Sequence, residues 1–382
     1  MNFDTNLNFP SLQLNQYQRK VSDKATLNLS AARMETLHVD QLISYASDAD
    51  KKEWETLRLD YVHERGSLKL RQSIASLYPN VTEEQILVFA GAQEAIFCAM
   101  NATITSKSRC GVVTPAYEAL FEIPKALGAQ IVPIPLKPQS NGWFLDIDDL
   151  KRAHVEKPFT NLILNFPHNP TGTLLSLELF EEIVNLSSIN DSWIVNDEVF
   201  RGLEHNPAKR LPPIASLTPR GISIGSISKP HGLGGLRIGW LACQSPELLE
   251  RALFYKQSLS VCSSSIDDWL ASLVIEHSSI LRRNATLIAL ENLDFIDKHF
   301  AQPHTKFEWN APSAGCVAFP ALRKDISVTH LANSLLSKHN IMIIPGECFS
   351  QSATNRFRLG YGQKNFKEVF NTFCNFLDMD YP

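Results

Sequence analysis

Short apolar runs alternate with amphipathic stretches through the middle of the chain. The runs that read as strands are "ILVFAG" (86–91), "CGVVTP" (110–115), "QIVPIPL" (130–136), "NLILNFP" (161–167), "SWIVND" (192–197), "GISIGSIS" (221–228) and "IGWLAC" (238–243). Strands without polar alternation are buried on both faces, and strands that alternate with helices are joined by parallel crossovers. The pattern therefore predicts an α/β protein with a mostly parallel sheet flanked by helices.

Helical spacing of apolar residues appears between and around these runs. The stretches with this spacing are residues 39–45, 68–78, 92–104 and 176–189, and the chain turns helical from about residue 246. The end of the chain adds the strand-like runs "GCVAFP" and "IMIIPG".

We expect three parts from this pattern. They are an N-terminal arm or small-domain segment of residues 1–40, a large domain of residues 41–280 and a smaller α+β domain of residues 281–382. Residues 1–30 lack clear periodicity, which fits either a frayed arm or an arm that packs over a site or a partner.

Composition narrows the class of protein. The 382 residues are 44% hydrophobic and 20% charged, with a formal net charge of −4 and a sequence pI near 6.3. This balance argues against a nucleic-acid or anionic-membrane surface. The seven cysteines are scattered without a C-x-x-C pair, so we expect buried thiols in a reducing compartment. The start of the chain lacks a secretory pattern and no apolar run reaches membrane-spanning length, so we expect a cytoplasmic protein.

Polar residues gather where the predicted strands end. Gln93, Tyr117, Asn169, Asp197 and Lys229 each follow a different apolar run. Each has an ordinary explanation as a turn residue, a helix cap, a core aromatic or a surface amine. Ligands of open parallel sheets, however, bind beyond the carboxyl ends of the strands. The conjunction of all five at one sheet edge predicts a binding site.

The chemistry of these residues suits one kind of cofactor. Burial lowers the pKa of a lysine such as Lys229 and makes it a nucleophile toward an aldehyde, and Asp197 can hold a protonated ring nitrogen. A helix that begins at Gly91, Ala92 and Gln93 offers backbone N–H groups to a phosphate. Further donors to a phosphate are Ser226, Ser228 and Arg237. Pyridoxal 5'-phosphate requires this set of groups.

The sequence resembles the class I/II aminotransferases of pyridoxal-phosphate fold type I. The motifs that carry the resemblance are "RGSLKLRQSIA" (65–75), "GAQEA" (91–95), "TPAYEAL" (114–120), "NFPHNPTG" (165–172), "NDEVFRGLE" (196–204), "SISKPHGLGGLRIGW" (226–240) and "NRFRLGYG" (355–362). The resemblance implies a large cofactor-binding domain, a smaller domain built from the C-terminal part and the N-terminal segment, and a homodimer. It also implies pyridoxal 5'-phosphate as cofactor and an amino acid and a 2-oxo acid as substrates.

Carried over motif by motif, the resemblance assigns roles to individual residues. Lys229 would form the Schiff base as an internal aldimine and later act as general base, and Asp197 would pair with the pyridinium nitrogen. Asn169 would donate to the ring oxygen and also contact the substrate, and Tyr117 would stack on the ring. Phe200 would be among the cofactor-binding residues. The remaining assignments are the phosphate contacts of Gly91, Ala92, Gln93, Ser226, Ser228 and Arg237, the substrate carboxylate contact of Arg358, and Tyr61 as the tyrosine that reaches a phosphate across the dimer.

One position departs from the family pattern. This chain has "DEVF" where the family usually has "DEVY", so Phe200 cannot donate a hydroxyl to the ring oxygen. We predict a more basic ring oxygen and a raised pKa of the internal aldimine. The departure and the following "RGLE" leave open a different outcome, in which the same carbanion is diverted to elimination, cyclisation or oxidation of an arginine-like amino acid.

Other interpretations of the motifs are weaker. The G-x-S-x-G match around Ser223 lies inside a predicted strand, so a hydrolase elbow is not expected. The glycines after Lys229 have the wrong spacing for a dinucleotide site. We expect no metal site, with His168 and His231 exposed in turns. A non-catalytic pyridoxal-phosphate-binding protein is the remaining alternative.

Overall fold

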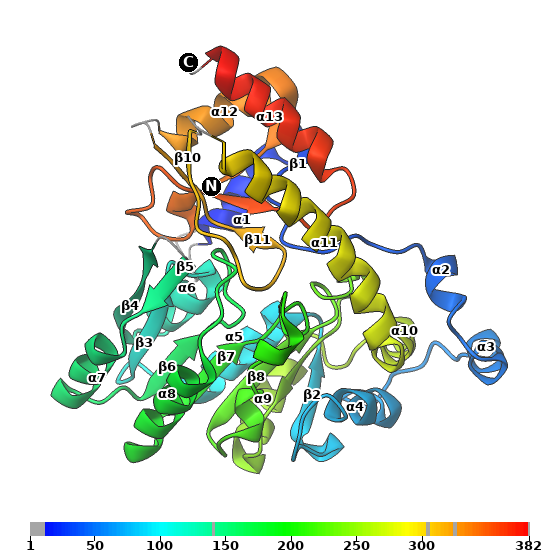
Figure 1. Ribbon diagram of the computed structural model, residues 1–382. Coiled ribbons are helices and arrows are strands. Elements are labelled where there is room, and N and C mark those ends of the chain that lie inside the picture. The colour runs from blue at the N-terminus through cyan, green and yellow to red at the C-terminus, as the bar shows by residue number, and fades with distance from the viewer. Residues whose placement is uncertain (1–11, 140–141, 303–305, 324–326, 381–382) are drawn as a thin grey trace.

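The computed structural model describes residues 12–139, 142–302, 306–323 and 327–380. Within these ranges a central sheet has the strand order β2-β9-β8-β7-β6-β3-β4-β5 (Figure 1). Its strands are β2 (Ile86–Phe89), β3 (Arg109–Thr114), β4 (Gln130–Gln139), β5 (Gly142–Leu145), β6 (Asn161–Leu164), β7 (Trp193–Asp197), β8 (Gly221–Ser226) and β9 (Gly239–Ala242). All the strands expected from the sequence in residues 86–243 are confirmed, and β5 was not predicted.

The sheet is mostly parallel, as the sequence predicts. Neighbouring strands from β4 through β3, β6 and β7 to β8 pair in parallel. Strand β9 is antiparallel to both β8 and β2, so β2 points the same way as β8. The strands β2, β3, β6, β7 and β8 therefore end at one edge of the sheet, where the candidate site residues follow them.

Helices cover both faces of the sheet. They are α4 (Leu68–Ala75), α5 (Ala92–Thr103), α6 (Glu118–Ala126), α7 (Ile147–Glu156), α8 (Leu177–Ile189), α9 (Pro246–Gln257) and α10 (Ser265–Glu276). Successive strand residues point to opposite faces. Ile163 and Val195 pack with α5 and α9, whereas Leu162 and Ile194 pack on the side of α7 and α8. Burial on both faces is the reason that these strands lack polar alternation.

The long helix α11 (Ser278–Phe300) leads from the sheet layers into a second domain, which lies above them in Figure 1. Its other elements are β10 (Phe307–Glu308), β11 (Val317–Ala318), β12 (Ala321–Leu322), α12 (Val328–His339), β13 (Ile341–Met342), β14 (Ile344–Pro345), β15 (Phe357–Gly360) and α13 (Phe366–Asp380). The N-terminal strand β1 (Leu27–Asn28) pairs with β13 and joins this domain. The division at residues 40 and 280 stays a prediction.

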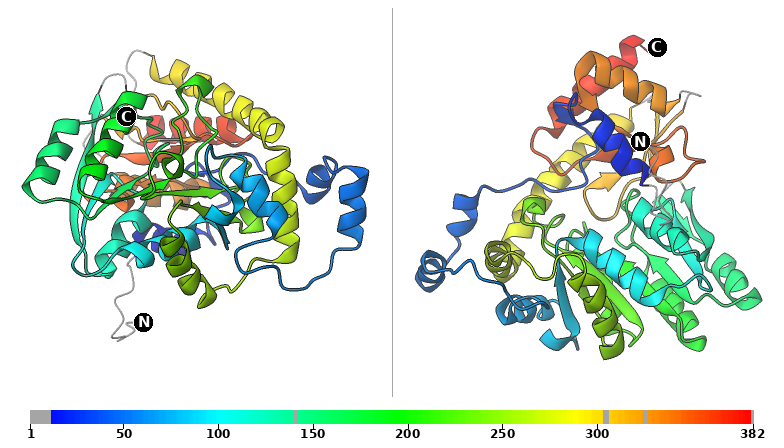
Figure 2. Two further views of the ribbon diagram at one scale, coloured as in Figure 1. Left: turned by 90° about the horizontal axis from the view of Figure 1, so that it is seen from below. Right: turned by 180° about the vertical axis from the view of Figure 1, so that it is seen from behind.

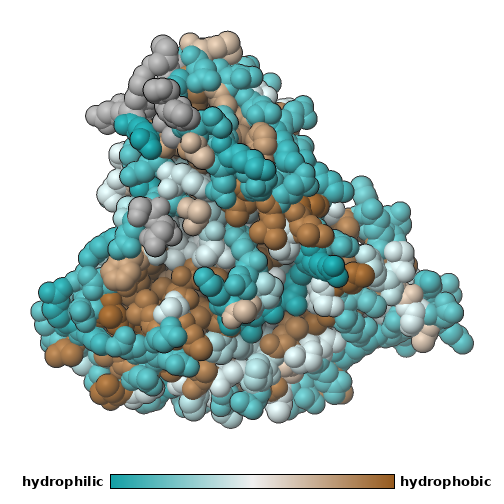
Figure 3. Space-filling view, in the orientation of Figure 1, coloured by the Kyte–Doolittle hydropathy of each residue, from teal (hydrophilic) through white to brown (hydrophobic). Residues whose placement is uncertain are grey.

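The N-terminal helix α1 (Gln13–Val21) lies at the junction of the two domains, as the rear view in Figure 2 shows. In Figure 3 this junction and the lower left of the molecule carry apolar residues, while most of the rest of that face is hydrophilic. An arm of α2 (Val39–Ile43) and α3 (Asp48–Glu55) stands out from the body in Figures 1 and 2.

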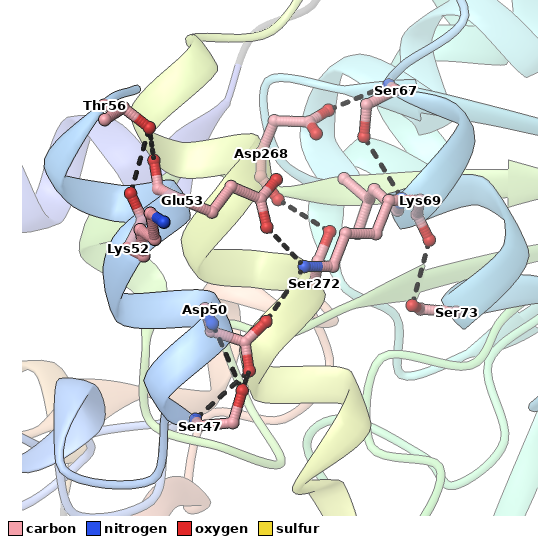
Figure 4. Close-up of polar contacts among 11 residues, drawn as sticks. Ser47, Asp50, Lys52, Glu53, Thr56, Ser67, Lys69, Ser73, Asp268 and Ser272 are labelled. Atoms are coloured by element: carbon pink, nitrogen blue, oxygen red, sulfur yellow. Dashed lines mark hydrogen bonds and ion pairs between the residues drawn. The ribbon is translucent and has the colours of Figure 1, made fainter. Parts of the chain in front are cut away.

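A lysine fixes this arm to the body. Lys69 on α4 reaches Asp50 at 3.2 Å and Glu53 at 3.0 Å on α3 (Figure 4). Its ammonium also lies 5.9 Å from the ring centroid of Trp269, which packs against Trp54 of the arm. The arm therefore has a defined attachment, although most of its surface does not touch the rest of the chain.

Candidate functional site

A cavity of about 340 Å³ lies where the expected strand ends, the small domain and α1 meet. The predicted residues that line it are Ala92, Gln93, Tyr117, Asn169, Asp197, Ser226, Ser228, Lys229, Arg237 and Arg358. Cavities of this size suit small-molecule ligands. The topology thus brings together residues that are spread over most of the sequence.

Lys229 lies three residues after the end of β8, and its largely buried side chain lines the cavity. Burial lowers the pKa of its amine, and the nearby guanidinium groups of Arg358 and Arg237 lower it further, while Asp197 opposes them. The carbonyl of Lys229 accepts hydrogen bonds from Met34 N at 3.4 Å and Gly232 N at 3.3 Å. The structure therefore holds the backbone in place and leaves an amine that deprotonates more readily than an ordinary lysine.

Asp197 ends β7 and is almost fully buried. Desolvation raises the pKa of its carboxyl to about 7, against the opposing effects of a backbone N–H and Lys229. Its Oδ1 accepts from Val199 N at 3.1 Å, and among the described residues it forms no ion pair. A buried carboxylate without a cationic partner is suited to a protonated nitrogen of a ligand.

Asn165 links two of the site residues, Asp197 and Asn169. The sequence analysis did not identify Asn165 as part of the site. Its Nδ2 donates to the carbonyl of Asp197 at 2.7 Å, and its Oδ1 accepts from Asn169 N at 2.9 Å. One amide therefore fixes the end of β7 against the turn that carries Asn169. The only signal in the sequence is that Asn165 directly follows the apolar run of β6.

An anion corner forms at the start of α5. We use this name for the first turn of α5 together with Ser226, Ser228 and Arg237. The N-cap residue Gly91 has φ +88° and provides no side-chain cap, so the first N–H groups of the helix keep no intrahelical acceptor. A Cβ on Gly91 would lie 2.4 Å from an Nη atom of Arg237. Glycine is therefore required there for the guanidinium to lie beside the helix N-terminus.

The other groups of the anion corner are held by local hydrogen bonds. Ser226 Oγ donates to Ser228 Oγ at 2.8 Å, and Ser228 N donates to Ser226 Oγ at 2.9 Å. Arg237, in the left-handed region with φ +46°, donates to Gly234 O at 2.9 Å and Ala90 O at 3.3 Å. Donors and a positive charge converge here, and Asp197 is the only carboxylate among the described residues that line the cavity. Such an arrangement suits a phosphate.

Arg358 enters the cavity from β15 and is buried. Its Nε donates to Ser30 O at 3.2 Å and its Nη1 donates to Asn169 Oδ1 at 3.2 Å. Desolvation lowers the pKa of this guanidinium to about 10. No described carboxylate pairs with it, so a carboxylate of a ligand would relieve its burial.

Tyr117 stands between the anion corner and the domain junction. Its hydroxyl donates to Gln93 Oε1 at 2.9 Å, and burial raises its pKa to about 12. The ring is therefore neutral at physiological pH and fixed at its hydroxyl end.

Helix α1 closes the cavity, and a buried glutamate holds it. Glu118 accepts from Leu14 N at 2.6 Å and from Asn15 N at 3.0 Å, at the first turn of α1. The Tyr17 hydroxyl donates to Ile343 O at 2.9 Å. For the described residues of the N-terminal arm, the alternative of an arm that packs over a site is therefore the correct one. The individual residues of this arm that line the cavity were not predicted; they are Leu14, Asn15, Gln18, Asn28, Ser30 and Arg33. No spacing in the sequence relates residue 14 to residue 118.

Three predicted site residues do not line the cavity. Gly91 acts through the backbone, as described above. Phe200 is fully buried in the apolar core of the small domain, where it belongs to one cluster with residues of α11 and α13. Tyr61 is 87% exposed on the loop between α3 and α4. Within one chain, therefore, Tyr61 does not meet the anion corner.

The expectation that His168 and His231 are exposed is wrong. Both are buried, and their ring nitrogens lie 2.8 Å from Thr171 Oγ1 and 2.7 Å from Ser278 Oγ, respectively. Ser223 lies inside β8 and donates to Glu198 Oε1 at 2.8 Å, as a strand residue rather than an elbow nucleophile. No group of metal-ligating side chains occurs among the described residues.

The cysteines are free thiols, as expected, but they are not all buried. Cys262 and Cys348 are partly exposed. Along the described ranges, no helix combines the length and apolar character needed to cross a membrane.

The fold and the site are those of a pyridoxal-phosphate-dependent enzyme. Comparison with known proteins identifies the family. The family model for class I and II aminotransferases matches residues 24–371. The chain therefore belongs to the class I and II aminotransferase family, with pyridoxal 5'-phosphate as its cofactor. The predicted family, fold class, cofactor and aminotransferase activity are confirmed.

Two relatives and two solved structures illustrate the match. The chain is 29% identical over 297 residues to capreomycidine synthase from Streptomyces vinaceus, covering 78% of this chain and 75% of the relative. It is 28% identical over 319 residues to the arginine–pyruvate transaminase of Pseudomonas aeruginosa, covering 78% and 77%. A PLP-dependent aminotransferase from Streptococcus suis superposes with a TM-score of 0.89 at 24% identity over 97% and 98% of the chains. The PLP-dependent cyclase OrfR superposes with a TM-score of 0.88 at 22% identity, and the match covers 99% of this chain and 100% of the cyclase chain.

Proposed function

We propose that the chain transfers the amino group of an amino acid to a 2-oxo acid, using Lys229 as the residue that carries the cofactor. The observation that supports this most directly is the cavity itself, which combines a deprotonatable amine, a buried carboxylate and an anion corner. When bound, pyridoxal 5'-phosphate supplies an aldehyde and a ring that accepts electrons.

The donor set fits this cofactor. The phosphate would be held by the anion corner, through the Ala92 and Gln93 amides together with the side chains of Ser226, Ser228 and Arg237. Asp197 would hold the ring nitrogen in its protonated state, and Tyr117 would stack on the ring. Asn169 Oδ1 already accepts from Arg358, so its Nδ2 is the amide atom left to donate to the ring oxygen.

The remaining groups would bind the substrate and move its proton. Arg358 would bind the α-carboxylate through two parallel N–H···O bonds. The Nζ of Lys229 would then accept the substrate's α-proton, because burial favours the neutral form of this amine. Helix α1 would exclude water from the reacting atoms.

We further propose a homodimer, with Tyr61 reaching the anion corner of the second copy. The loop 61–66 packs beside α9, where Lys256 Nζ donates to Glu64 O at 2.6 Å and Arg65 pairs with Glu250 at 3.1 Å. Exposed apolar side chains occur along the chain from residue 59 to the start of α4 and from α9 to the start of α10: Leu59, Tyr61, Leu68, Phe254, Leu259, Val261 and Ile266. Such a concentration is typical of an interface between subunits.

A second outcome shares all these residues. One relative is named a synthase and one structural neighbour a cyclase, so the same carbanion could be directed to cyclisation, elimination or oxidation. Phe200 stands where the family usually has a tyrosine, and this departure from the family pattern is compatible with an outcome other than amino transfer.

The test is a half-reaction assay with the holoenzyme. Absorbance of the bound cofactor is followed with a panel of amino acids, and the new amino acid formed from an added 2-oxo acid is quantified. Borohydride reduction and peptide mapping should place the cofactor on Lys229, and Lys229→Ala should abolish both signals. Oxygen uptake or a cyclic product without amino transfer would favour the second outcome. A cofactor found on another residue would contradict the assignment, and a bound cofactor that no amino acid affects would indicate a non-catalytic protein.

A further inference from the structure

A second cavity, of about 230 Å³, lies between the turn that follows Lys229 and the start of α11. Its volume is below the roughly 300–1,000 Å³ of sites for drug-sized molecules, which indicates a small ligand. Ser226 lines both this cavity and the cofactor cavity, so the two share a wall. All the lining residues lie outside the two segments proposed for the subunit interface, so one chain forms the second cavity.

Three arginines line the second cavity, and only one of them has a carboxylate partner. Arg210 Nε donates to Glu204 Oε2 at 2.7 Å. Within the described part of the chain, the side chains of Arg201 and Arg282 donate only to backbone carbonyls and form no ion pair. A guanidinium has five N–H donors, so these two arginines keep donors for a ligand.

The fold holds these guanidinium groups near one another. Burial lowers the pKa of Arg282, and Arg210 and Arg201 lower it further, while Glu204 opposes them. A Cβ on Gly202 would overlap Nη1 of Arg282, so the guanidinium packs against a backbone that has no side chain there. A bound anion would compensate the like charges that this packing brings together.

A buried hydroxyl adds a neutral donor to the second cavity. Tyr78, just after α4, is 5% exposed and lines the cavity. Its oxygen accepts from Trp240 Nε1 at 2.7 Å. None of the described residues accepts the proton of this hydroxyl, which therefore remains for a ligand.

The second cavity has a net positive charge. Glu198 is the single carboxylate among the described residues that line it, and burial raises the pKa of that carboxyl. Burial lowers the pKa of His231 to about 3, so this ring is neutral. Even with Glu198 ionised, the three arginines outnumber this carboxylate and the Glu204 partner of Arg210.

We propose that the second cavity binds inorganic phosphate or another small tetrahedral oxyanion, and that the bound ion ties the turn after Lys229 to α11. Donors come from three separate parts of the chain: Arg201 after β7, Arg282 on α11 and Tyr78 after α4. This arrangement suits an ion with oxygens in four directions better than a planar carboxylate. The turn and α11 already meet where His231 Nε2 lies 2.7 Å from Ser278 Oγ. The site is additional to the proposed amino transfer and does not depend on it.

Calorimetry of the holoenzyme with phosphate, sulfate and acetate tests the site. The cofactor's own phosphate would occupy the anion corner, so the added ion would not titrate that corner. We expect one phosphate per chain, sulfate of similar affinity and acetate about 10-fold weaker or worse. Arg282→Gln should weaken phosphate binding about 10-fold or more, because it removes one charged contact. Arg283→Gln is the matched control, since Arg283 is the exposed neighbour on α11 that does not line the cavity.

Two further measurements separate this site from the cofactor cavity and from misfolding. Arg358→Gln should keep the phosphate binding, although Arg358 is another buried cation. Phosphate at about 100 times its Kd should raise the melting temperature of the wild type by about 3 °C, and should not raise that of Arg282→Gln. If Arg282→Gln fails to fold, Arg282→Lys keeps the charge without the fork and should bind phosphate more weakly than the wild type.

Three results would overturn the inference. They are no phosphate binding by the wild type, binding that is lost in Arg358→Gln but kept in the Arg282 variants, and acetate binding as tight as that of phosphate.

Discussion

Individual buried groups set the chemistry of the cavity, because burial changes their charge. Desolvation lowers the pKa of Lys229, raises that of Asp197 to about 7 and lowers that of Arg358 to about 10. In each case burial penalises the charged form of the group, and pairing with a ligand of opposite charge would offset that penalty. The residues that carry the proposed reaction are thus costly for the fold without a ligand.

The cost of Asp197 should be visible in the stability of the apoprotein. Its folded-state pKa of about 7 exceeds the ordinary value of 3.8. Its contribution to stability is therefore fully present below about pH 4 and is lost as the pH rises through about 7. The quantity to compare is the free energy of unfolding of Asp197→Asn minus that of the wild type. We expect this difference to be larger at pH 8 than at pH 4 by on the order of 2–4 kcal/mol, in favour of the variant. Urea unfolding of both apoproteins at the two pH values measures this, and a pH-independent difference would contradict it.

Phe200 leads to a prediction for the cofactor. A hydroxyl donor at this position would stabilise the ionised ring oxygen, so the pKa of the cofactor–lysine imine should be higher in the wild type than in Phe200→Tyr. Spectrophotometric pH titration of the two holoenzymes gives both values. If the pKa of the imine were no lower in Phe200→Tyr than in the wild type, the prediction that the missing hydroxyl raises this pKa would be wrong. Because Phe200 is fully buried, the hydroxyl of Phe200→Tyr would have no partner in the apoprotein and would lower its stability by about 1–3 kcal/mol, which unfolding of the apo variant detects.

At the scale of elements, ends and connections build the site. The first turn of α5 provides free N–H groups, the turn after β8 carries Lys229, and β15 carries Arg358. Close packing makes these ends rigid: a Cβ on Gly239 would lie 2.3 Å from Ala92 N, so β9 and α5 meet with no room for a side chain. Helix α1 differs from these elements, because a few specific contacts hold it.

Loss of the Glu118 contacts should loosen α1. Glu118→Ala leaves Leu14 N and Asn15 N without their acceptor, and hydrogen bonds to a charged group are worth about 1.5–3 kcal/mol. We expect amide exchange in residues 13–21 to accelerate about 10-fold or more and the KM for amino acids to rise, with cofactor affinity unchanged. Glu118→Gln keeps one acceptor oxygen, so its exchange rate and its KM should lie between those of the wild type and those of Glu118→Ala.

Glu122→Ala is the matched control for this experiment. Glu122 lies one turn further along α6 and pairs with Lys125 at 3.4 Å instead of with α1. Equal effects of the alanine variants at positions 118 and 122 would show that α6, and not the contact with α1, is responsible.

At the scale of the whole molecule, the exposed apolar residues around Tyr61 and α9 lie apart from the cavity of their own chain. In the proposed homodimer they would be covered, and Tyr61 would act on the second copy. The arm of α2 and α3, fixed by Lys69 (Figure 4), leads into this surface. Assembly and cofactor binding should therefore be coupled.

A charge at this surface should separate the subunits. Leu259, which is 54% exposed on the loop after α9, is changed to glutamate, and the mass is measured by light scattering. We expect a shift from dimer to monomer and weaker cofactor binding. Ile189→Glu is the control, since Ile189 is 78% exposed at the end of α8 and should not affect the mass. A dimer that persists in the Leu259 variant would place the interface elsewhere.

The sequence by itself determined the sheet and the sheet-edge half of the site. Strands buried on both faces leave continuous apolar runs, and parallel strands must end at a common edge, so local pattern is sufficient to place Asn169, Asp197 and Lys229 together. Neither the antiparallel direction of β9 nor the hairpin strand β5 leaves such a signature. The exposure of His168 and His231 was misjudged because turn residues are usually at the surface, whereas these turns are covered by the second domain and α11.

Only the tertiary structure decided what closes the cavity. The contacts of Glu118 with α1, of Arg358 with Ser30 and of Arg33 with Gln363 join residues about 100 to 330 positions apart. Such pairings depend on how two domains dock, and docking leaves no periodic signal in either segment. For the same reason the chemistry of the cofactor end follows from the sequence, whereas the substrate end becomes visible only once the N-terminal segment is in place.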